Sequence, residues 1–196
     1  IQAFVEGLFN AELVAGAERD HRHPEAVFVF AGPPGVGKTF LAEEGARALG
    51  RPFRRFDMSA YSGPQAGESL IGVHRSFHGA HAGLLTGWVA VHPNAVLLFD
   101  EIEKAHLHTL HLFLQVLDVG SLEDQFTERS VDFRETLLIF TTNAGRMLYD
   151  RPEANALRHA PPEFHRRTLL GALESELDPR SSAPLFPPAL CSRLAA

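Results

Sequence analysis

The chain has 196 residues, enough for one domain with a substantial core, and its 45% hydrophobic and 21% charged content is typical of a globular protein. Its net charge of −6 provides no basic footprint for nucleic acid, and one cysteine, Cys191, allows no internal disulfide. No apolar run approaches the roughly 20 residues of a membrane span. We therefore expect no nucleic-acid or membrane partner and a reducing, cytoplasmic location.

The first part of the chain alternates helix and strand patterns. Apolar residues at helical spacing predict a helix over residues 1–16. Residues 26–30 are an apolar, β-branched and aromatic run that predicts a buried strand, and residues 40–49 follow as a helix. Residues 53–57 alternate in polarity and predict a second strand, and residues 58–68 have the composition of a loop.

The rest of the chain continues this alternation after a glycine- and histidine-rich stretch at residues 72–83. Residues 95–101 are the clearest strand, because four consecutive apolar residues imply burial on both faces, as in the middle of a parallel sheet. The order of strands and helices predicts an α/β fold with a central parallel sheet. The other predicted elements are helices at 84–92, 107–117, 164–177 and 188–194, a hairpin within 122–134 and a strand at 136–143.

One motif lies between the first strand and the helix after it, and it matches G-x-x-x-x-G-K-[ST], the phosphate-loop pattern. Glycines allow backbone N–H groups to approach phosphates, and the start of the helix adds a positive dipole end. Lys38 is expected to reach the β- and γ-phosphates, and Thr39 to offer its hydroxyl to Mg²⁺. A Gly/Pro turn without a ligand is the alternative interpretation. The motif is Gly32, Pro33, Pro34, Gly35, Val36, Gly37, Lys38 and Thr39.

Polar residues follow the third and fourth predicted strands. Asp100 and Glu101 end the third strand, and ligands of an open α/β sheet bind outside this edge. We expect Asp100 to lie on the Mg²⁺ side of the site and Glu101 to polarise a water for attack on the γ-phosphate. Asn143 ends the fourth strand and is either a second residue that orients this water or an ordinary turn residue.

The motifs in this order resemble the large subdomain of an AAA+ ATPase, and within that group the second ATPase module of Clp-type unfoldases and disaggregases. The resemblance implies a P-loop NTPase three-layer sandwich with the parallel strand order 5-1-4-3-2, and ATP with Mg²⁺ as cofactors. Besides the phosphate loop, it is carried by residues 57–59 (Asp-Met-Ser), 70–72 (Leu-Ile-Gly), 97–106 (Leu-Leu-Phe-Asp-Glu-Ile-Glu-Lys-Ala-His), 114–118 (Leu-Gln-Val-Leu-Asp), 131–134 (Val-Asp-Phe-Arg) and 141–145 (Thr-Thr-Asn-Ala-Gly).

The resemblance also implies individual roles. Asp100 supports Mg²⁺, Glu101 is the catalytic base and Asn143 is the first sensor. Residues 186–193 resemble a family segment that ends in an arginine finger, which makes Arg193 a residue that serves the ATP of a neighbouring subunit in a homo-oligomeric, hexameric ring. Ala189 stands where that segment has Glu, and Ser192 where it has Asn, so a plain surface arginine is the alternative.

The family's pore loop, which grips polypeptide substrates, corresponds to residues 77–79 (Phe-His-Gly). Phe77 is the expected aromatic contact with substrate, and packing of Phe77 into the core is the alternative. The nearby histidines, including His74, His78 and His81, suggest either a metal site or simply a histidine-rich surface.

The resemblance covers most of residues 26–145, and we expect residues 1–196 to be a large subdomain that lacks the fifth strand and the small helical subdomain. The first strand would then lie at an open edge. The expected function is Mg-dependent ATP hydrolysis in a Clp-type chaperone that remodels proteins. A nucleotide-gated scaffold or regulatory ATPase is the main alternative, and the net charge argues against a nucleic-acid-linked AAA+ protein.

Overall fold

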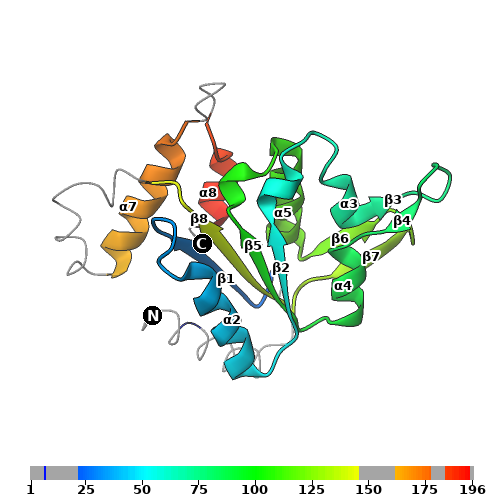
Figure 1. Ribbon diagram of the computed structural model, residues 1–196, viewed down its shortest axis with the longest axis horizontal. Coiled ribbons are helices and arrows are strands. Elements are labelled where there is room, and N and C mark those ends of the chain that lie inside the picture. The colour runs from blue at the N-terminus through cyan, green and yellow to red at the C-terminus, as the bar shows by residue number, and fades with distance from the viewer. Residues whose placement is uncertain (1–6, 8–21, 146–161, 178–183, 195–196) are drawn as a thin grey trace.

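A computed structural model describes residue 7, residues 22–145, 162–177 and 184–194 (Figure 1). Four parallel strands form the central sheet in the order β1-β8-β5-β2, which is 1-4-3-2 when these four strands are numbered along the chain. This confirms the predicted fold class and the order of the four strands. Within the described residues no strand pairs with the outer edge of β1. The strands are β1 (Ala26–Ala31), β8 (Leu137–Thr142), β5 (Val96–Asp100) and β2 (Phe53–Asp57).

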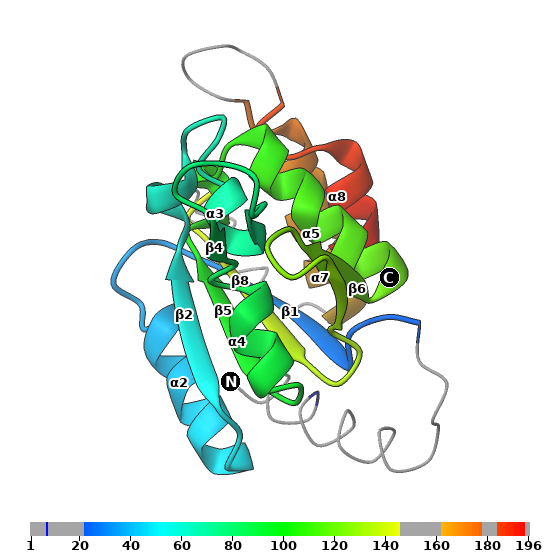
Figure 2. The same cartoon turned by 90° about the vertical axis from the view of Figure 1, so that its right-hand side faces the viewer.

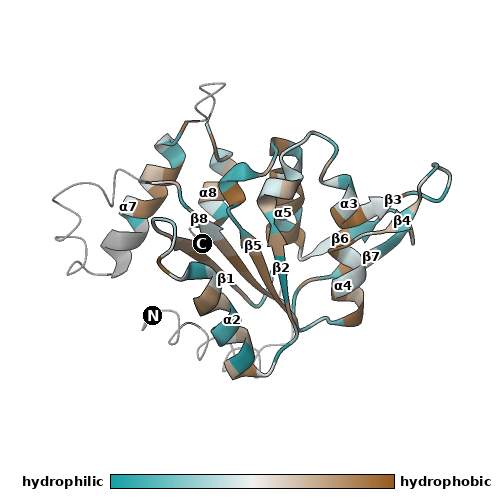
Figure 3. Ribbon diagram, viewed as in Figure 1, coloured by the Kyte–Doolittle hydropathy of each residue, from teal (hydrophilic) through white to brown (hydrophobic). Residues whose placement is uncertain are grey.

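Helices cover both faces of the sheet, so the molecule has three layers. Figure 2 shows α2 (Lys38–Leu49) on one side of the sheet, with α5 (Leu107–Val119) and α8 (Pro188–Leu194) on the other. Each face has its own apolar cluster, because successive side chains of β5 and β8 point to opposite faces. Leu98 packs toward α2, whereas Phe99 packs toward α5. Both central strands are fully buried, as their continuous apolar sequence predicts (Figure 3).

The predicted helix over residues 1–16 lies outside the described residues, apart from Gly7, which is helical. The helix predicted at residues 164–177 is α7 (Pro162–Ser175), and the one at 188–194 is α8. Gly120 ends α5 in the left-handed conformation, with φ of 71°, and its N–H donates to Val116 O at 2.9 Å.

The prediction of a loop over residues 58–68 was wrong in part. A 3₁₀ helix, η1 (Met58–Tyr61), follows β2 directly, and α3 (Glu68–Ile71) starts at the end of this stretch. The Asp57 side chain caps η1 by accepting from Ser59 N at 3.0 Å. Composition favoured a loop because a single capped turn is too short to show a helical period.

Two short hairpins and a helix lie beside the sheet, beyond β2. The first hairpin, β3 (Gly72–Val73) and β4 (His81–Ala82), forms within the glycine- and histidine-rich stretch, and its turn projects at the right of Figure 1. The second is β6 (Ser121–Asp124) with β7 (Arg129–Asp132), as predicted within residues 122–134. Helix α4 (Thr86–Val91) packs against this second hairpin.

A buried carboxylate ties these elements together. Asp124 on β6 is 2% exposed, and its Oδ2 accepts from Gly83 N at 2.9 Å and from Thr86 Oγ1 at 2.5 Å. Its Oδ1 accepts from both N and Oγ1 of Thr127, at 2.8 and 2.9 Å. Burial alone would raise the pKa of Asp124, but these hydrogen bonds outweigh it and lower the pKa below its ordinary value of 3.8. Asp124 therefore fixes the base of the first hairpin through its negative charge.

Asp124→Asn is expected to lower the free energy of unfolding by about 1–3 kcal/mol at pH 7, because an amide NH₂ would face buried N–H donors. A carboxylate whose pKa is lower in the folded than in the unfolded state stabilises the folded protein at pH values above its unfolded-state pKa. This stabilisation is lost as the pH falls through the folded-state pKa. The difference in unfolding free energy between wild type and variant should thus narrow below about pH 4, near the ordinary Asp pKa of 3.8. Urea unfolding at several pH values measures this. The solvent-facing neighbour Glu123, changed to Gln, is the control, and a difference that is constant with pH would contradict the prediction.

The described residues contain no helix that is both long and apolar enough to cross a membrane.

Candidate nucleotide-binding site

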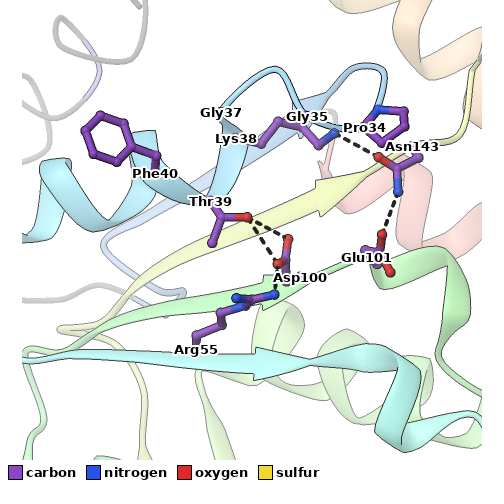
Figure 4. A pocket seen from close by; sticks show the side chains of 10 residues that line it. All are labelled: Pro34, Gly35, Gly37, Lys38, Thr39, Phe40, Arg55, Asp100, Glu101 and Asn143. Atoms are coloured by element: carbon purple, nitrogen blue, oxygen red, sulfur yellow. Dashed lines mark hydrogen bonds and ion pairs between the residues drawn. The ribbon is translucent and has the colours of Figure 1, made fainter.

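A cavity of about 460 Å³ lies where the loop after β1 meets the carboxyl ends of β5 and β8 (Figure 4). This is the sheet edge at which the sequence placed the acidic pair. The cavity is lined mainly by residues of the phosphate-loop motif, by Arg55 from the middle of β2 and by polar residues at the carboxyl ends of β5 and β8. The lining residues are Pro34, Gly35, Gly37, Lys38, Thr39, Phe40, Arg55, Asp100, Glu101 and Asn143.

The phosphate loop depends on two glycines for its shape. Gly35 and Gly37 have φ of 80° and 91°, in the left-handed region that favours glycine. No atom lies within 4 Å of where a Cβ would stand at either position, so the backbone conformation rather than crowding requires glycine. Gly37 leads directly into α2, which places the positive end of the helix dipole at the cavity wall.

Lys38 holds its ammonium inside the loop. Its Nζ donates to Gly32 O at 2.7 Å, to Pro33 O at 3.0 Å and to Asn143 Oδ1 at 2.9 Å. Burial lowers the pKa of Lys38 below its ordinary value of 10.5, although three nearby carboxylates act in the opposite direction. All three donors of the ammonium are satisfied by the chain, so the charge is fixed in position at the cavity.

Asp100 forms the floor of the site and is 5% exposed. Thr39 Oγ1 donates to its two carboxylate oxygens at 3.1 and 3.3 Å, and Thr141 Oγ1 also donates to it. From the edge strand β2, Arg55 Nη2 forms an ion pair with Asp100 Oδ2 at 2.6 Å. The carboxylate is therefore held by two hydroxyls and a guanidinium.

The oxygen atoms here suit a Mg²⁺ ion that arrives with a nucleotide. Such ions usually keep several waters and take only one or two protein ligands besides phosphate oxygens. The Thr39 hydroxyl and the Asp100 carboxylate would supply these ligands. Across the described residues, histidines included, no group of three or more His, Cys, Asp or Glu side chains could enclose a metal by itself.

Glu101 has a backbone conformation that is rare for its residue type. Its φ of 58° is left-handed, a conformation that costs of order 1–3 kcal/mol in a residue other than glycine. Glu101 N donates to Thr141 Oγ1 at 2.9 Å, which holds this turn against β8. Asn143 Nδ2 donates to Oε1 at 2.9 Å, and Lys104 Nζ pairs with Oε2 at 2.8 Å. The hydrogen bond that Lys104 donates to Glu101, together with the negative charge of Glu101, raises the pKa of Lys104.

Asn143 connects the basic and acidic sides of the cavity. Its Oδ1 accepts from Lys38, and its Nδ2 donates to Glu101 and, at 3.1 Å, to Glu103 Oε1. Asn143 N donates to the same Glu103 oxygen at 3.2 Å. Glu103 thus fixes which way the Asn143 amide points, while its own Oε2 is buried with no hydrogen-bond partner among the described residues.

Four residues of this network were not expected from the sequence: Arg55, Glu103, Lys104 and Thr141. Arg55 belongs to a strand predicted from alternating polarity and Thr141 to the end of another predicted strand, and neither was given a role in the site. Glu103 and Lys104 did lie inside a motif that carried the family resemblance. Their position within three residues of Glu101 was the signal that could have identified them.

Arg193 does not line the cavity of its own chain. It lies on the exposed surface of α8, where its Nε pairs with Asp118 Oδ1 at 2.6 Å and its Nη2 donates to Oδ2 at 3.3 Å. The hydrogen bond and the negative charge of Asp118 raise the pKa of Arg193 above its ordinary value.

Phe77 lies in the turn between β3 and β4 and is 65% exposed, so the alternative of packing into the core is wrong. The turn is held on the second hairpin by two contacts. His74 Nε2 pairs with Glu128 Oε1 at 2.7 Å, and Arg75 Nε donates to Phe126 O at 2.8 Å. The exposed Phe77 ring therefore lies on a turn that is fixed to the second hairpin.

A parallel sheet with a phosphate loop, an adjacent acidic pair and a polar residue at the next strand end defines a P-loop nucleotide-binding protein. The family model described as AAA domain (Cdc48 subfamily) matches residues 23–194, and the chain belongs to this family. Together with the relatives described below, this makes the chain a Clp-type AAA+ ATPase domain.

Several curated relatives carry Clp names. The chain is 44% identical over 137 residues to a ClpA homolog protein of Fuscovulum blasticum, covering 69% of this chain and 17% of that protein. It is 39% identical over 160 residues to ClpE, an ATP-binding subunit of the ATP-dependent Clp protease of Lactococcus lactis, covering 80% and 21%. A closed-state reconstruction of Hsp104 with ATPγS and FITC-casein has a TM-score of 0.78 and 28% identity, covering 98% of this chain and 32% of that one. The chain thus spans about a fifth of the length of these curated relatives.

Proposed function

We propose that this chain binds ATP with Mg²⁺ and hydrolyses its β–γ phosphoanhydride bond, as the large subdomain of a ring-forming Clp-type chaperone that remodels proteins. The observation that carries the proposal is the meeting of Lys38, the Thr39–Asp100 pair and the Glu101–Asn143 pair around one cavity. These are the groups that phosphoryl transfer to water requires, because its catalysis consists mainly of positioning and charge stabilisation.

Each residue would have a distinct part in this reaction. Lys38 would move its hydrogen bonds from the two loop carbonyls to the β- and γ-phosphate oxygens. Mg²⁺, when bound through Thr39 and Asp100, would neutralise charge that develops on the phosphates. Asn143 would orient the attacking water between its amide and Glu101, and Glu101 would accept a proton from that water. Glu101 can do so after its present ion pair with Lys104 loosens, because this pair now occupies Oε2.

Arg193 is proposed to complete the site of a neighbouring subunit. Arg193 is not among the residues that line its own cavity, which supports action in trans, and its exposed ion pair with Asp118 can exchange for phosphate oxygens at little cost. A head-to-tail contact that brings α8 to the next cavity must close into a ring if every subunit is to be served.

The test is the rate of Mg-ATP hydrolysis per subunit as the protein concentration rises, measured in the longest soluble form of the protein. We expect the wild-type rate to climb with concentration and the Arg193→Ala rate to stay low and flat. Arg47→Ala, which removes another exposed arginine with an acidic partner, is the matched control and should behave like wild type. ATP that binds but is not hydrolysed at any concentration would contradict the proposed hydrolysis and favour a nucleotide-gated scaffold.

Phe77 is proposed to contact polypeptide substrates in the pore of the ring. Phe77→Ala should abolish ATP-dependent unfolding of a fluorescent protein substrate. The rate of ATP hydrolysis should stay within about twofold of wild type, because the Phe77 side chain does not line the nucleotide cavity. His78→Ala, on the neighbouring exposed residue, is the control. Unfolding that persists in Phe77→Ala would remove Phe77 from the mechanism, whereas a wild type that hydrolyses ATP without unfolding the substrate would favour the scaffold interpretation.

A further inference from the structure

One aromatic side chain lines the nucleotide cavity, and the proposed hydrolysis gives it no role. Phe40 follows Thr39 in the first turn of α2, and its side chain is part of the cavity wall. In Figure 4 it stands at the opposite end of the cavity from Glu101 and Asn143. With 66% exposure, it is among the most exposed large hydrophobic residues in the described part of the chain.

Phe40 is not needed to hold α2 on the sheet. The helix packs through a stripe of small and aliphatic residues, and Phe40 lies outside this stripe, on the face that also carries the exposed Arg47 and Ala48. No ring-to-ring or cation–π contact is found for Phe40 among the described residues. The packed stripe consists of Leu41, Ala42, Gly45, Ala46 and Leu49.

The chemistry of the cavity gives a bound nucleotide one direction. The terminal phosphate must lie where Lys38, Asn143 and Glu101 meet, because the attacking water is activated there. The phosphates of a nucleotide bound in this direction would lie along the loop toward Thr39, and its sugar and base would lie toward the far end, where Phe40 lines the cavity. An exposed apolar ring at that end offers a flat surface of the kind on which nucleobases stack.

From this arrangement, which rests on the proposed ATP binding, we propose that Phe40 stacks on the base of the bound nucleotide and contributes to its affinity. The ring acts on the part of the ligand that carries no phosphate. Its contribution should therefore be present for any ligand with a base and absent for a bare polyphosphate.

The experiment compares dissociation constants for ATP, ADP and inorganic tripolyphosphate by calorimetry, each with Mg²⁺. Phe40→Ala should raise the dissociation constants of ATP and ADP roughly 5- to 20-fold, the lower part of the range for a stacked base, since the ring stays partly in water. The constant for tripolyphosphate should change by less than about twofold. Phe40→Tyr should retain the wild-type values, because it keeps an aromatic face. Val91→Ala, at an exposed apolar residue on α4, is the control for losing surface hydrophobicity.

Three outcomes would overturn this proposal alone. Equal losses for ATP and tripolyphosphate would mean that the substitution disturbs the phosphate loop. Unchanged affinity for all three ligands would mean that the ring does not touch the base. A loss of ATP affinity seen only at protein concentrations where chains associate would assign Phe40 to a contact between chains. Failure of wild type to bind ATP would refute the proposed function as well, whereas the first three outcomes leave it intact.

Discussion

Glu101→Gln is expected to lower kcat for ATP hydrolysis about 10²–10⁴-fold and to leave the dissociation constant of ATP within a few-fold of wild type. Glutamine keeps the shape of the side chain, so its carbonyl oxygen can still accept from Asn143 Nδ2. It has no carboxylate to accept a proton from water. Binding depends instead on the phosphate loop and Lys38, which this substitution does not touch. Steady-state hydrolysis and equilibrium ATP binding, measured on the same protein, check both parts.

The control for Glu101→Gln is Glu68→Gln, at an exposed glutamate of α3 that does not line the cavity. It should hydrolyse ATP at the wild-type rate. If Glu101→Gln retained more than about a third of the wild-type kcat, Glu101 would not be the base. If it lost ATP binding instead, the Glu101 carboxylate would be assigned to holding the ligand and not to accepting the proton from water.

Phe99→Ala is expected to cost about 3–5 kcal/mol of unfolding free energy, a large share of the total for a domain of this size. Phe99 is 1% exposed at the centre of an aromatic cluster. Its ring centroid lies 4.5 Å from that of Phe113, 5.2 Å from that of Phe140 and 5.6 Å from that of Phe56. Removing the ring leaves a cavity between β5 and α5 that rigid neighbours fill only in part. Urea denaturation measures the loss.

Phe77→Ala removes the same atoms from an exposed position and should change the unfolding free energy by less than about 0.5 kcal/mol. Phe99→Leu should fall between the two, because it keeps most of the apolar volume. A loss below about 1.5 kcal/mol for Phe99→Ala would mean that the cluster collapses around the gap and is not closely packed. Since Phe99 directly precedes Asp100, reduced nucleotide affinity in the same variant would measure how far the core positions the site.

The parts of this protein that the sequence determined are those whose signals are local. The strand at Val96–Asp100 could be predicted because burial on both faces requires a continuous apolar run. The phosphate loop was readable because the left-handed conformations at Gly35 and Gly37 demand glycine at those positions. The alternation of strands and helices then placed the loop and the acidic pair at one edge of a parallel sheet, which the structure confirms.

The tertiary structure alone decided which side chains meet. Asn143 lies 105 residues from Lys38 and 42 from Glu101, yet it bonds to both, because adjacent parallel strands bring their carboxyl ends together. No spacing rule in the sequence encodes a partner at such a separation. The ion pair of Arg55 with Asp100 arises in the same way, from the pairing of β2 with β5. Phe40 was only one residue of a predicted helix until the fold put its ring on the cavity wall. Local chemistry thus specifies the elements and their motifs, whereas contacts between distant residues exist only once the sheet has set its strand order and register.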